Sequence, residues 1–351
     1  MMTAIDTTWS ARADIGQRSL DYFFGTDEPQ LLNNTYPCEP GDNATFNYWW
    51  LAHVIDVRLD AYARTGDGRC LDAAEQTYRN ILARNGGSLF NDYFDDMLWY
   101  GLAILRMHDA TGDSRYLDDA KAIWEHVVEF GWNDQQGYSV AWRKQQLDYK
   151  NTPANGPFVI FSCRLGQLIP DVRYRRLAQT AYDWLTNNLL GETGFVEDGI
   201  NREQDGRIDT QWRFTYNQGL YIGAAVELGR LTGNPDNLQL ASRTALTAIQ
   251  ELGAGGVFRD EGDGGDEGLF KGVYYRYVSL LLADLDPLSA TALAVSGFIR
   301  SSTQALWENN LRGDLLLAGN DWSTSPSGKI AYSTQLSAIM ALEVRARLDD
   351  A

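Results

Sequence analysis

The sequence contains few of the residues that build disulfide frameworks and metal sites. Its 351 residues include three cysteines, Cys38, Cys70 and Cys163, and three histidines. The cysteines lie far apart and make no CxxC or Cys/His spacing of the kind that binds zinc. We therefore expect no disulfide framework, no bound metal and no cofactor.

Long apolar runs are also missing. No stretch is apolar over the length needed to span a membrane. Residues 1–10 lack the basic and apolar regions of a signal peptide. These absences predict a reducing, cytoplasmic location, although a secreted protein from which a leader had been removed would show the same pattern.

Basic residues are scarce relative to acidic ones. Thirty Lys and Arg face 47 Asp and Glu, which gives a formal net charge of −17. Nucleic acids and anionic membrane surfaces are bound by clustered Lys and Arg, so this balance argues against both partners. The aromatic content, by contrast, is high, with 11 Trp, 18 Tyr and 13 Phe. Many of these rings belong to a core, but aromatic faces also stack on sugar rings. The oligomeric state is not indicated.

Helical periodicity recurs along the whole chain, with turn residues between the segments. The first, third, fifth, seventh and ninth segments are amphipathic, whereas the even-numbered segments are more uniformly apolar. Outer helices that face water and inner helices that face one another give this alternation. Six of each predict an all-α fold, the six-fold α/α barrel, with an open solenoid as the alternative. No linker divides the chain, so we expect one domain over residues 1–351. The predicted helices cover residues 8–24, 46–65, 69–84, 94–110, 114–130, 151–168, 170–189, 215–232, 235–251, 269–283, 287–309 and 330–348.

Three of the connections share the pattern Thr-Gly-Asp or Thr-Gly-Asn. Their glycines, Gly66, Gly112 and Gly233, can each end a helix in the left-handed conformation. The helices that follow the first two begin with the near copies Leu-Asp-Ala-Ala and Leu-Asp-Asp-Ala. This is the pattern of a repeated helical hairpin.

An acidic pair, Asp95 and Asp96, stands at the start of the most apolar helix. Residues 97–105 are all apolar or small, so these are the only ionisable groups that this helix brings into the interior. Desolvating two neighbouring carboxylates is costly, and sites that tolerate it are often catalytic. The alternative is that Asp95 is a plain N-cap of the helix. Two other acidic pairs, Asp118-Asp119 and Asp349-Asp350, lie in polar or terminal contexts.

Polar and aromatic side chains gather at the beginnings of the inner helices. In a barrel of alternating helices these ends emerge on one face, where amides, phenols and indoles suit a neutral polyhydroxyl ligand. Taken alone, Asn151 or Asn217 fits a helix cap better, but six clusters together favour a binding site. The residues that we expect to line it are Asn47, Trp49, Tyr149, Lys150, Asn151, Asn155, Tyr216, Asn217, Gln218, Phe270, Lys271 and Gln335.

Six motifs occur in one order over about residues 45–340: Tyr93-Phe94-Asp95-Asp96, Trp142-Arg143, Asp148-Tyr149-Lys150-Asn151, Asn155-Gly156, Thr215-Tyr216-Asn217-Gln218-Gly219 and Phe270-Lys271-Gly272. In combination they resemble glycoside hydrolase family 76, the endo-α-1,6-mannanases. The resemblance implies a six-fold α/α barrel and retaining hydrolysis of α-1,6-linked mannose chains. It makes Asp95 the nucleophile and Asp96 the acid/base, and adds Trp142 to the substrate-binding residues.

Retaining hydrolysis places demands on this pair. It needs two carboxyl groups about 5–5.5 Å apart, one ionised for attack and one protonated for the leaving oxygen. Neighbouring residues in mid-helix point about 100° apart, so the pair must lie where the chain enters the helix. The helix N-terminus favours the anion of Asp95 but works against the proton on Asp96. Repulsion from Asp95 and burial must keep that proton in place.

Three other functions fit parts of the sequence. Sugar epimerases on α/α barrels use histidine, but His53 falls inside the second predicted helix, His108 near the far end of the fourth and His126 on an outer helix. None lies at the binding face, and all three are interpreted as structural. A carbohydrate-binding protein with a dead site is the second alternative. A transglycosylase, which shares the covalent intermediate, is the third.

Two further features are interpreted as structural. The carboxylates of residues 261–268 are closely spaced, as in calcium sites, but they fit no EF-hand loop, and a solvated loop is the favoured interpretation. Asp198 and Gly199 either contribute to the binding face or make a turn, and the turn is slightly favoured.

Overall fold

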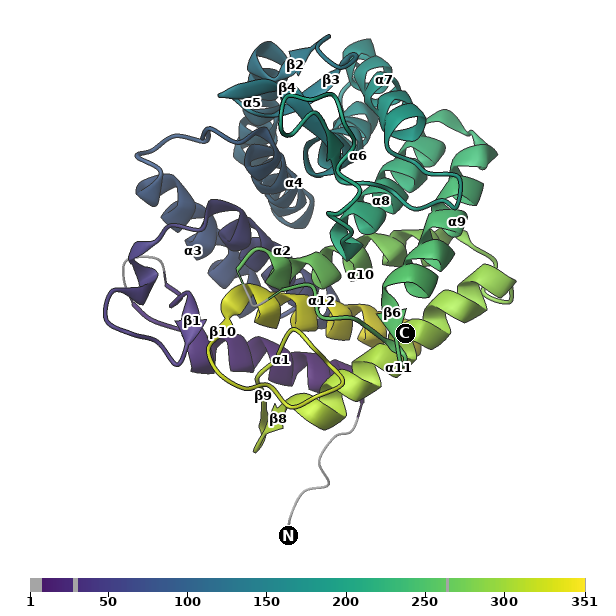
Figure 1. Cartoon of the computed structure of the whole chain (residues 1–351). Coiled ribbons are helices and arrows are strands. Elements are labelled where there is room, and N and C mark those ends of the chain that lie inside the picture. The colour runs from purple at the N-terminus through teal and green to yellow at the C-terminus, as the bar shows by residue number, and fades with distance from the viewer. Residues whose placement is uncertain (1–7, 28–30, 263–264, 351) are drawn as a thin grey trace. The chain divides into compact units, whose positions relative to one another are not determined.

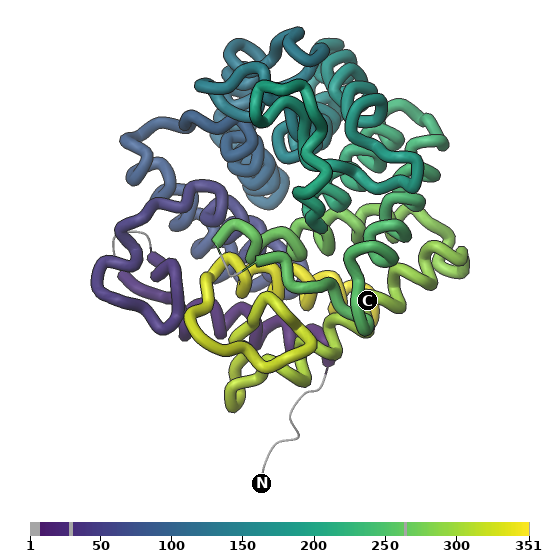
Figure 2. The backbone as a smooth tube through the Cα atoms, viewed as in Figure 1, coloured from purple at the N-terminus to yellow at the C-terminus, as the bar shows by residue number. Residues whose placement is uncertain are grey.

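The computed structural model describes residues 8–27, 31–262 and 265–350 (Figure 1). Each of the twelve predicted helices is present, with ends that differ from the prediction by at most three residues. Figure 2 traces the backbone through them. The helices are α1 (Trp9–Phe24), α2 (Tyr48–Thr65), α3 (Gly68–Arg84), α4 (Phe94–Thr111), α5 (Ser114–Phe130), α6 (Thr152–Leu168), α7 (Val172–Asn188), α8 (Thr215–Thr232), α9 (Pro235–Leu252), α10 (Glu267–Asp284), α11 (Ala290–Asn310) and α12 (Tyr332–Asp349).

The strands are short, and the sequence pattern predicted none of them. Four form an antiparallel sheet in the order β2–β3–β4–β5, and the others pair two by two as β1–β10, β6–β7 and β8–β9. A 3₁₀ helix spans Asp42–Ala44. The strands are β1 (Thr35–Tyr36), β2 (Trp132–Asn133), β3 (Ser139–Arg143), β4 (Gln146–Asn151), β5 (Gly199–Ile200), β6 (Gly253–Ala254), β7 (Val257–Phe258), β8 (Leu311–Arg312), β9 (Leu315–Leu316) and β10 (Ile330–Ala331).

Backbone contacts divide the chain into two compact units. The first unit comprises Met1–Arg84, Gly253–Arg276 and Ser296–Ala351, and the second comprises Asn85–Leu252 and Tyr277–Val295. The organisation as one domain over residues 1–351 stays a prediction.

The predicted alternation of helix polarity is present in both units. In the second unit, α4, α6 and α8 are buried along most of their length, whereas α5, α7 and α9 bury one face. Helix α6 packs against α4, α7 and α8, so the apolar helices meet one another. In the first unit, α2 and α12 are the buried pair, and the amphipathic α3 and α1 cover them. Burial of apolar surface therefore assigns each of these ten helices to the layer that its sequence predicts.

The three Thr-Gly connections have one geometry. Gly66, Gly112 and Gly233 end α2, α4 and α8 at φ of 69°, 71° and 74°, in the left-handed region that glycine enters without strain. In each connection the threonine hydroxyl donates to the carbonyl four residues earlier and accepts from the amide two residues later. The predicted repeat is confirmed at these turns.

The three cysteines are free thiols, with Cys163 buried and Cys38 exposed. Most of the largest fully buried side chains are tyrosines and tryptophans. Over the described ranges of the chain, no helix combines the length and hydropathy needed to cross a membrane.

Candidate active site

The acidic pair lies in the first turn of α4, where the chain enters the helix as predicted. The N-cap position is Tyr93, whose backbone is extended and whose side chain makes no capping bond. Asp95 is 9% exposed, and Asp96 is half-buried. The Oδ1 of Asp95 accepts from the backbone N–H of Asp96 at 3.0 Å. Asp95 is therefore the second residue of the helix, and the interpretation of this residue as the N-cap is wrong.

Neutral groups donate to both carboxylates. The indole Nε1 of Trp142 donates to Asp95 Oδ2 at 3.1 Å. The amide Nδ2 of Asn91 donates to Asp96 Oδ2 at 3.0 Å, while its Oδ1 accepts from the backbone of Tyr93 at 2.8 Å. Both donors orient the carboxyl group that they bind without forming an ion pair. The indole N–H favours the ionised form of Asp95, whereas the Asn91 amide can equally donate to the carbonyl oxygen of a protonated Asp96.

Trp142 lies in β3 of the β3–β4 hairpin, and β3 packs against α4. Arg143, next to Trp142, forms an antiparallel bridge with Tyr93, and the N–H of Lys144 donates to the carbonyl of Asp92 at 2.9 Å. The Tyr93 and Trp142 rings meet edge to face at 5.4 Å, and the Arg143 guanidinium lies 4.6 Å from the Trp142 ring centroid. Backbone pairing and ring contacts together fix the indole N–H against Asp95.

A third carboxylate, Asp198, is the centre of a hydrogen-bond cluster. It is 1% exposed. Its Oδ1 accepts from the Tyr216 hydroxyl at 2.9 Å and from Asn217 Nδ2 at 3.0 Å. Its Oδ2 accepts from the Tyr149 hydroxyl at 2.9 Å and from Arg202 Nη2. Four donors from three separate elements converge on one buried carboxylate, which holds their side chains in fixed positions.

Asp198 precedes β5, so the interpretation of Asp198 and Gly199 as a turn is wrong. Gly199 pairs with Asn151 at the end of β4. A Cβ atom on Gly199 would lie 2.6 Å from the Tyr149 hydroxyl, closer than van der Waals contact allows. Glycine is therefore required here because the phenol must pass close to the backbone to reach Asp198.

Arg202 and Asp209, which the sequence did not indicate, complete this cluster. Arg202 Nε donates to Asp209 Oδ2 at 3.0 Å, and the Tyr149 hydroxyl lies 3.0 Å from the same oxygen. Burial raises the pKa of Asp209 above its usual range. Burial, followed by the charge of Asp198, raises the pKa of both Tyr149 and Tyr216. The two phenols therefore stay protonated and act as donors.

The acidic pair and the Asp198 cluster belong to one site within the second unit. The Trp142 ring, which binds Asp95, meets the Tyr149 ring edge to face at 5.6 Å. The charge of Asp95 is also among the causes that raise the pKa of Tyr216, after burial and the charges of Asp198 and Tyr149. Trp142, Tyr149, Tyr216 and Asn217 are thus brought together with Asp95, as the sequence predicted.

Four other predicted residues of the second unit are hydrogen-bonded to backbone. Lys150 Nζ donates to the carbonyls of Ser139 and Asn133 at 2.6 and 3.2 Å, and burial lowers the pKa of this lysine to about 7. Asn151 accepts from the N–H of Ala154 and caps α6. These two side chains join β4 to its neighbours.

Asn155 and Gln218 each pair with one backbone unit. Asn155 accepts from the N–H of Val140 at 2.8 Å and donates to its carbonyl at 2.9 Å. Gln218 does the same with Val196, at 2.9 and 2.7 Å. Both side chains are fully buried. Contact of Lys150, Asn151, Asn155 and Gln218 with a substrate stays a prediction.

The remaining predicted residues belong to the first unit. Asn47 Nδ2 donates to Asn34 Oδ1 at 2.8 Å. Lys271 donates to the carbonyl of Asn320, and Gln335 Oε1 accepts from the N–H of Ala318 at 3.0 Å. Phe270 is 7% exposed. These contacts hold loops against α2, α10 and α12, and the role of the four residues in substrate binding stays a prediction.

Trp49 shares its partner with the next residue. The indoles of Trp49 and Trp50 donate to the same oxygen, Asp266 Oδ1, at 2.9 and 2.7 Å. Asp266 belongs to the acidic segment 261–268, of which Asp263 and Gly264 lie outside the described residues. One carboxylate of this segment therefore fixes two tryptophans, which the sequence did not indicate.

The histidines occupy the helices predicted for them. His53 is buried in α2, 3.5 Å from Asp56. His108 Nδ1 lies 2.9 Å from the carbonyl of Asp113 at the C-terminal end of α4. His126 on α5 stacks on Phe90 at 4.0 Å, and burial lowers its pKa to about 4. His108 lies more than three helical turns from Asp95 along the same helix. It is therefore too far from Asp95 to act in the same site, which argues against its use as the acid/base of an epimerase.

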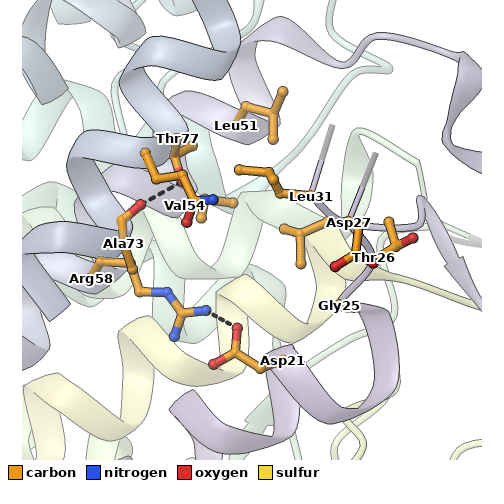
Figure 3. Close-up of a pocket in the computed structure, with 12 residues that line it drawn as sticks. Asp21, Gly25, Thr26, Asp27, Leu31, Leu51, Val54, Arg58, Ala73 and Thr77 are labelled. Atoms are coloured by element: carbon orange, nitrogen blue, oxygen red, sulfur yellow. Dashed lines mark hydrogen bonds and ion pairs between the residues drawn. The ribbon is translucent and has the colours of Figure 1, made fainter. Parts of the chain in front are cut away.

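The first unit also contains a cavity of about 580 Å³ among α1, α2 and α3 (Figure 3). Arg58 and Asp21 form an ion pair beside it, and Leu31, Leu51 and Val54 supply apolar surface. None of the described residues that line it belongs to the predicted site. The cavity is a feature of the helix packing that the sequence did not reveal.

Comparison with known proteins decides the family. Residues 7–348 match the sequence profile of glycosyl hydrolase family 76. The chain belongs to this family. The resemblance to family 76 and the expectation of a glycoside hydrolase are thereby confirmed.

Solved structures of similar proteins cover almost the whole chain. The Lin0763 protein of Listeria innocua is 48% identical over 98% of each chain, with a TM-score of 0.94. An α-1,6-mannanase of Salegentibacter sp. HEL1_6 is 34% identical over 97% of this chain and all of its own, with a TM-score of 0.90. That protein is an inactive variant, with two consecutive aspartates changed to asparagine, in complex with α-1,6-mannotriose. These matches confirm the predicted fold class, the α/α barrel of family 76.

Curated relatives are more distant. The mannan endo-1,6-alpha-mannosidase DCW1 of Saccharomyces cerevisiae is 24% identical over 206 residues, which are 53% of this chain and 45% of the yeast protein. The chain spans less than half the length of the curated relatives that it matches.

Proposed function

We propose that this chain is a retaining glycoside hydrolase of α-1,6-linked mannose chains, with Asp95 as nucleophile and Asp96 as acid/base. The observation that carries the proposal is the placement of Asp95, a nearly buried carboxylate in the first turn of α4 that accepts from the indole of Trp142. Hydrogen-bond donors and a helix N-terminus beside a carboxylate stabilise its anion and oppose the effect of burial. This is the state that a nucleophile needs.

The relatives support both the residues and the substrate. The inactive Salegentibacter variant is changed at two consecutive aspartates, and it binds α-1,6-mannotriose. Three pairs of consecutive aspartates occur in the present sequence, and only Asp95 and Asp96 lie in the first turn of a buried helix beside a polar cluster. The substrate that fits these features is a neutral chain of mannose residues.

The reaction would proceed in two steps. Asp95 attacks the anomeric carbon while Asp96 gives its proton to the leaving glycosidic oxygen, which produces a covalent glycosyl-enzyme. Asp96, now ionised, takes a proton from the incoming water, and the water releases the sugar from Asp95. The negative charge on Asp95 favours a proton on Asp96 before the first step.

The Asp198 cluster has a separate task. It fixes the hydroxyls of Tyr149 and Tyr216 and the amide of Asn217 beside the reacting carboxylates. Each phenol gives its single proton to a carboxylate and can still accept from a sugar hydroxyl. Groups that are held in fixed positions in this way need little reorganisation during the reaction. Asp198 therefore acts as a positioning residue in this proposal.

Incubation with yeast-type α-1,6-mannan backbone and with linear α-1,6-mannooligosaccharides, followed by separation of the products by size, tests the function. Mixed oligosaccharides support endo cleavage of α-1,6-mannan, and mannose alone indicates exo action. Products longer than the substrate indicate transglycosylation. The absence of any product, with the oligosaccharide bound, contradicts the proposal in favour of a carbohydrate-binding protein.

A further inference from the structure

The loop between β5 and α8, residues 201–214, carries an exposed tryptophan, Trp212, within the second unit. Trp212 is 39% exposed. Tryptophan is enriched at interaction surfaces, and a ring that its neighbours hold in place is preorganised for contact with a ligand. Trp212 is fixed in this way from two directions.

The first support is a row of aromatic rings. Trp212, Phe214 and Tyr216 occupy alternate positions, the first two in the loop before α8 and Tyr216 in its first turn. The Trp212 and Phe214 rings meet edge to face at 5.9 Å, and the Phe214 and Tyr216 rings follow at 6.2 Å. Tyr216 donates to Asp198. The row therefore leads from the exposed loop directly to the candidate active site.

The second support is the guanidinium of Arg202. Its central carbon lies 4.3 Å from the Trp212 ring centroid and 4.7 Å from the Tyr149 ring centroid. Its N–H groups donate to Asp198 and Asp209, so the cation is itself held in place. An arginine bound to the buried cluster thus supports the exposed indole, and little side-chain entropy remains to be lost when a ligand binds the ring.

We propose that Trp212 is an outer sugar-binding subsite of this active site, on which a mannose residue distant from the cleaved bond stacks. This inference rests on the proposed function, because the ligand is a further residue of the same mannose chain. The C–H groups of a pyranose are apolar and cover an aromatic face, while its hydroxyls stay in water. Because only chains long enough to extend from Asp95 along the aromatic row reach Trp212, the subsite would favour longer chains.

The test compares kcat/KM on α-1,6-mannohexaose with kcat/KM on α-1,6-mannotriose for the full chain and its variants. In Trp212→Ala the hexaose-to-triose ratio should fall by about fivefold or more, and in Trp212→Phe, which keeps an aromatic face, by less than about twofold. Tyr138→Ala is the matched control. Tyr138 is 60% exposed and lies beyond the opposite end of β3 from Trp142, so the ratio should be unchanged.

Calorimetric binding of the hexaose to an Asp95→Asn form, with and without Trp212→Ala, gives a second measurement that does not depend on turnover. Weaker binding by about tenfold supports the subsite. An unchanged ratio and unchanged binding in Trp212→Ala, or equal losses on both substrates, would overturn it. Failure of the unaltered chain to cleave either oligosaccharide would contradict the proposed function instead, and the binding comparison with the unaltered chain would then still decide on Trp212.

Discussion

Trp142 and Asp95 are joined by a hydrogen bond of 3.1 Å from the indole Nε1 to the carboxylate Oδ2. The same indole ring contacts Tyr149, whose hydroxyl donates to Asp198. Two side chains, Trp142 and Tyr149, thus connect the proposed nucleophile with Asp198, which accepts four hydrogen bonds. Loss of any of these contacts should affect catalysis more than folding.

Trp142→Phe keeps an aromatic ring but removes the N–H that binds Asp95. We expect kcat/KM on α-1,6-mannooligosaccharides to fall about tenfold, ~1.4 kcal/mol, because a hydrogen bond to a charged group is lost. Trp184→Phe is the control, since its indole donates to a backbone carbonyl, that of Gln136, at 2.7 Å. Normal activity in Trp142→Phe together with an unchanged Tm would contradict this role of the indole.

Asn217→Ala removes a donor to Asp198, whereas Asn155→Ala removes two bonds to the backbone of Val140. The first variant should lower kcat/KM by more than about tenfold with a small change in Tm. The second should lower Tm, since a buried backbone unit loses its partner. Steady-state kinetics and thermal unfolding of both variants check this. A large loss of Tm in Asn217→Ala, with normal specific activity of the folded fraction, would favour a structural role for Asn217.

Gly199→Ala places a methyl group 2.6 Å from the Tyr149 hydroxyl. The phenol must then move away from Asp198, and we expect a loss of activity of about tenfold or more along with a lower Tm. Gly297→Ala in α11, where a Cβ meets nothing within 4 Å, should leave activity unchanged. A Gly199→Ala variant with full activity would show that the Tyr149–Asp198 bond is dispensable.

Lys150 should make stability depend on pH. Burial lowers its pKa to about 7 in the folded chain, whereas the unfolded chain has the ordinary value of 10.5. Between these values the unfolded state binds a proton that the folded state does not, so this residue makes the free energy of unfolding rise with pH. Below about pH 7 both states are protonated, and the contribution is constant.

Urea unfolding of the unaltered chain and of Lys150→Met at about pH 7 and about pH 9 tests this expectation. The difference in unfolding free energy between the two proteins should change with pH in the direction that favours the unaltered chain at the higher pH. A difference that is independent of pH would contradict it. If Lys150 also binds the substrate, Lys150→Met should in addition raise KM.

Much of the helical fold could be predicted from the sequence because it is recorded in local patterns. The alternation of apolar and amphipathic segments and the turns at Gly66, Gly112 and Gly233 depend on residues close together in the chain. The position of Asp95 and Asp96 in the first turn of α4 could be predicted for the same reason. A fully apolar run forms a buried helix, so a charged pair that directly precedes the run is placed at the start of that helix.

The Asp198 cluster could not be predicted because its contacts are non-local. Asp198 binds side chains from β4, from the loop after β5 and from α8, and β5 has only two residues, too few to show an alternating pattern. Arg202 and Asp209 lie in a polar loop that resembles an ordinary turn. Their role follows from the β4–β5 pairing, which no periodicity in the sequence revealed.

The most direct test of the central claim is to trap the glycosyl-enzyme on Asp95→Ala and Asp96→Ala with an activated aryl α-mannoside. In Asp96→Ala the first step should survive, because the activated group leaves without a proton. A covalent sugar on Asp95 should then accumulate in mass spectra, and added azide should speed its release because azide needs no general base. In Asp95→Ala no intermediate should form. An intermediate in Asp95→Ala but not in Asp96→Ala would reverse the two roles, and partial losses of activity in both variants, with no intermediate in either, would contradict the claim that this pair performs the reaction.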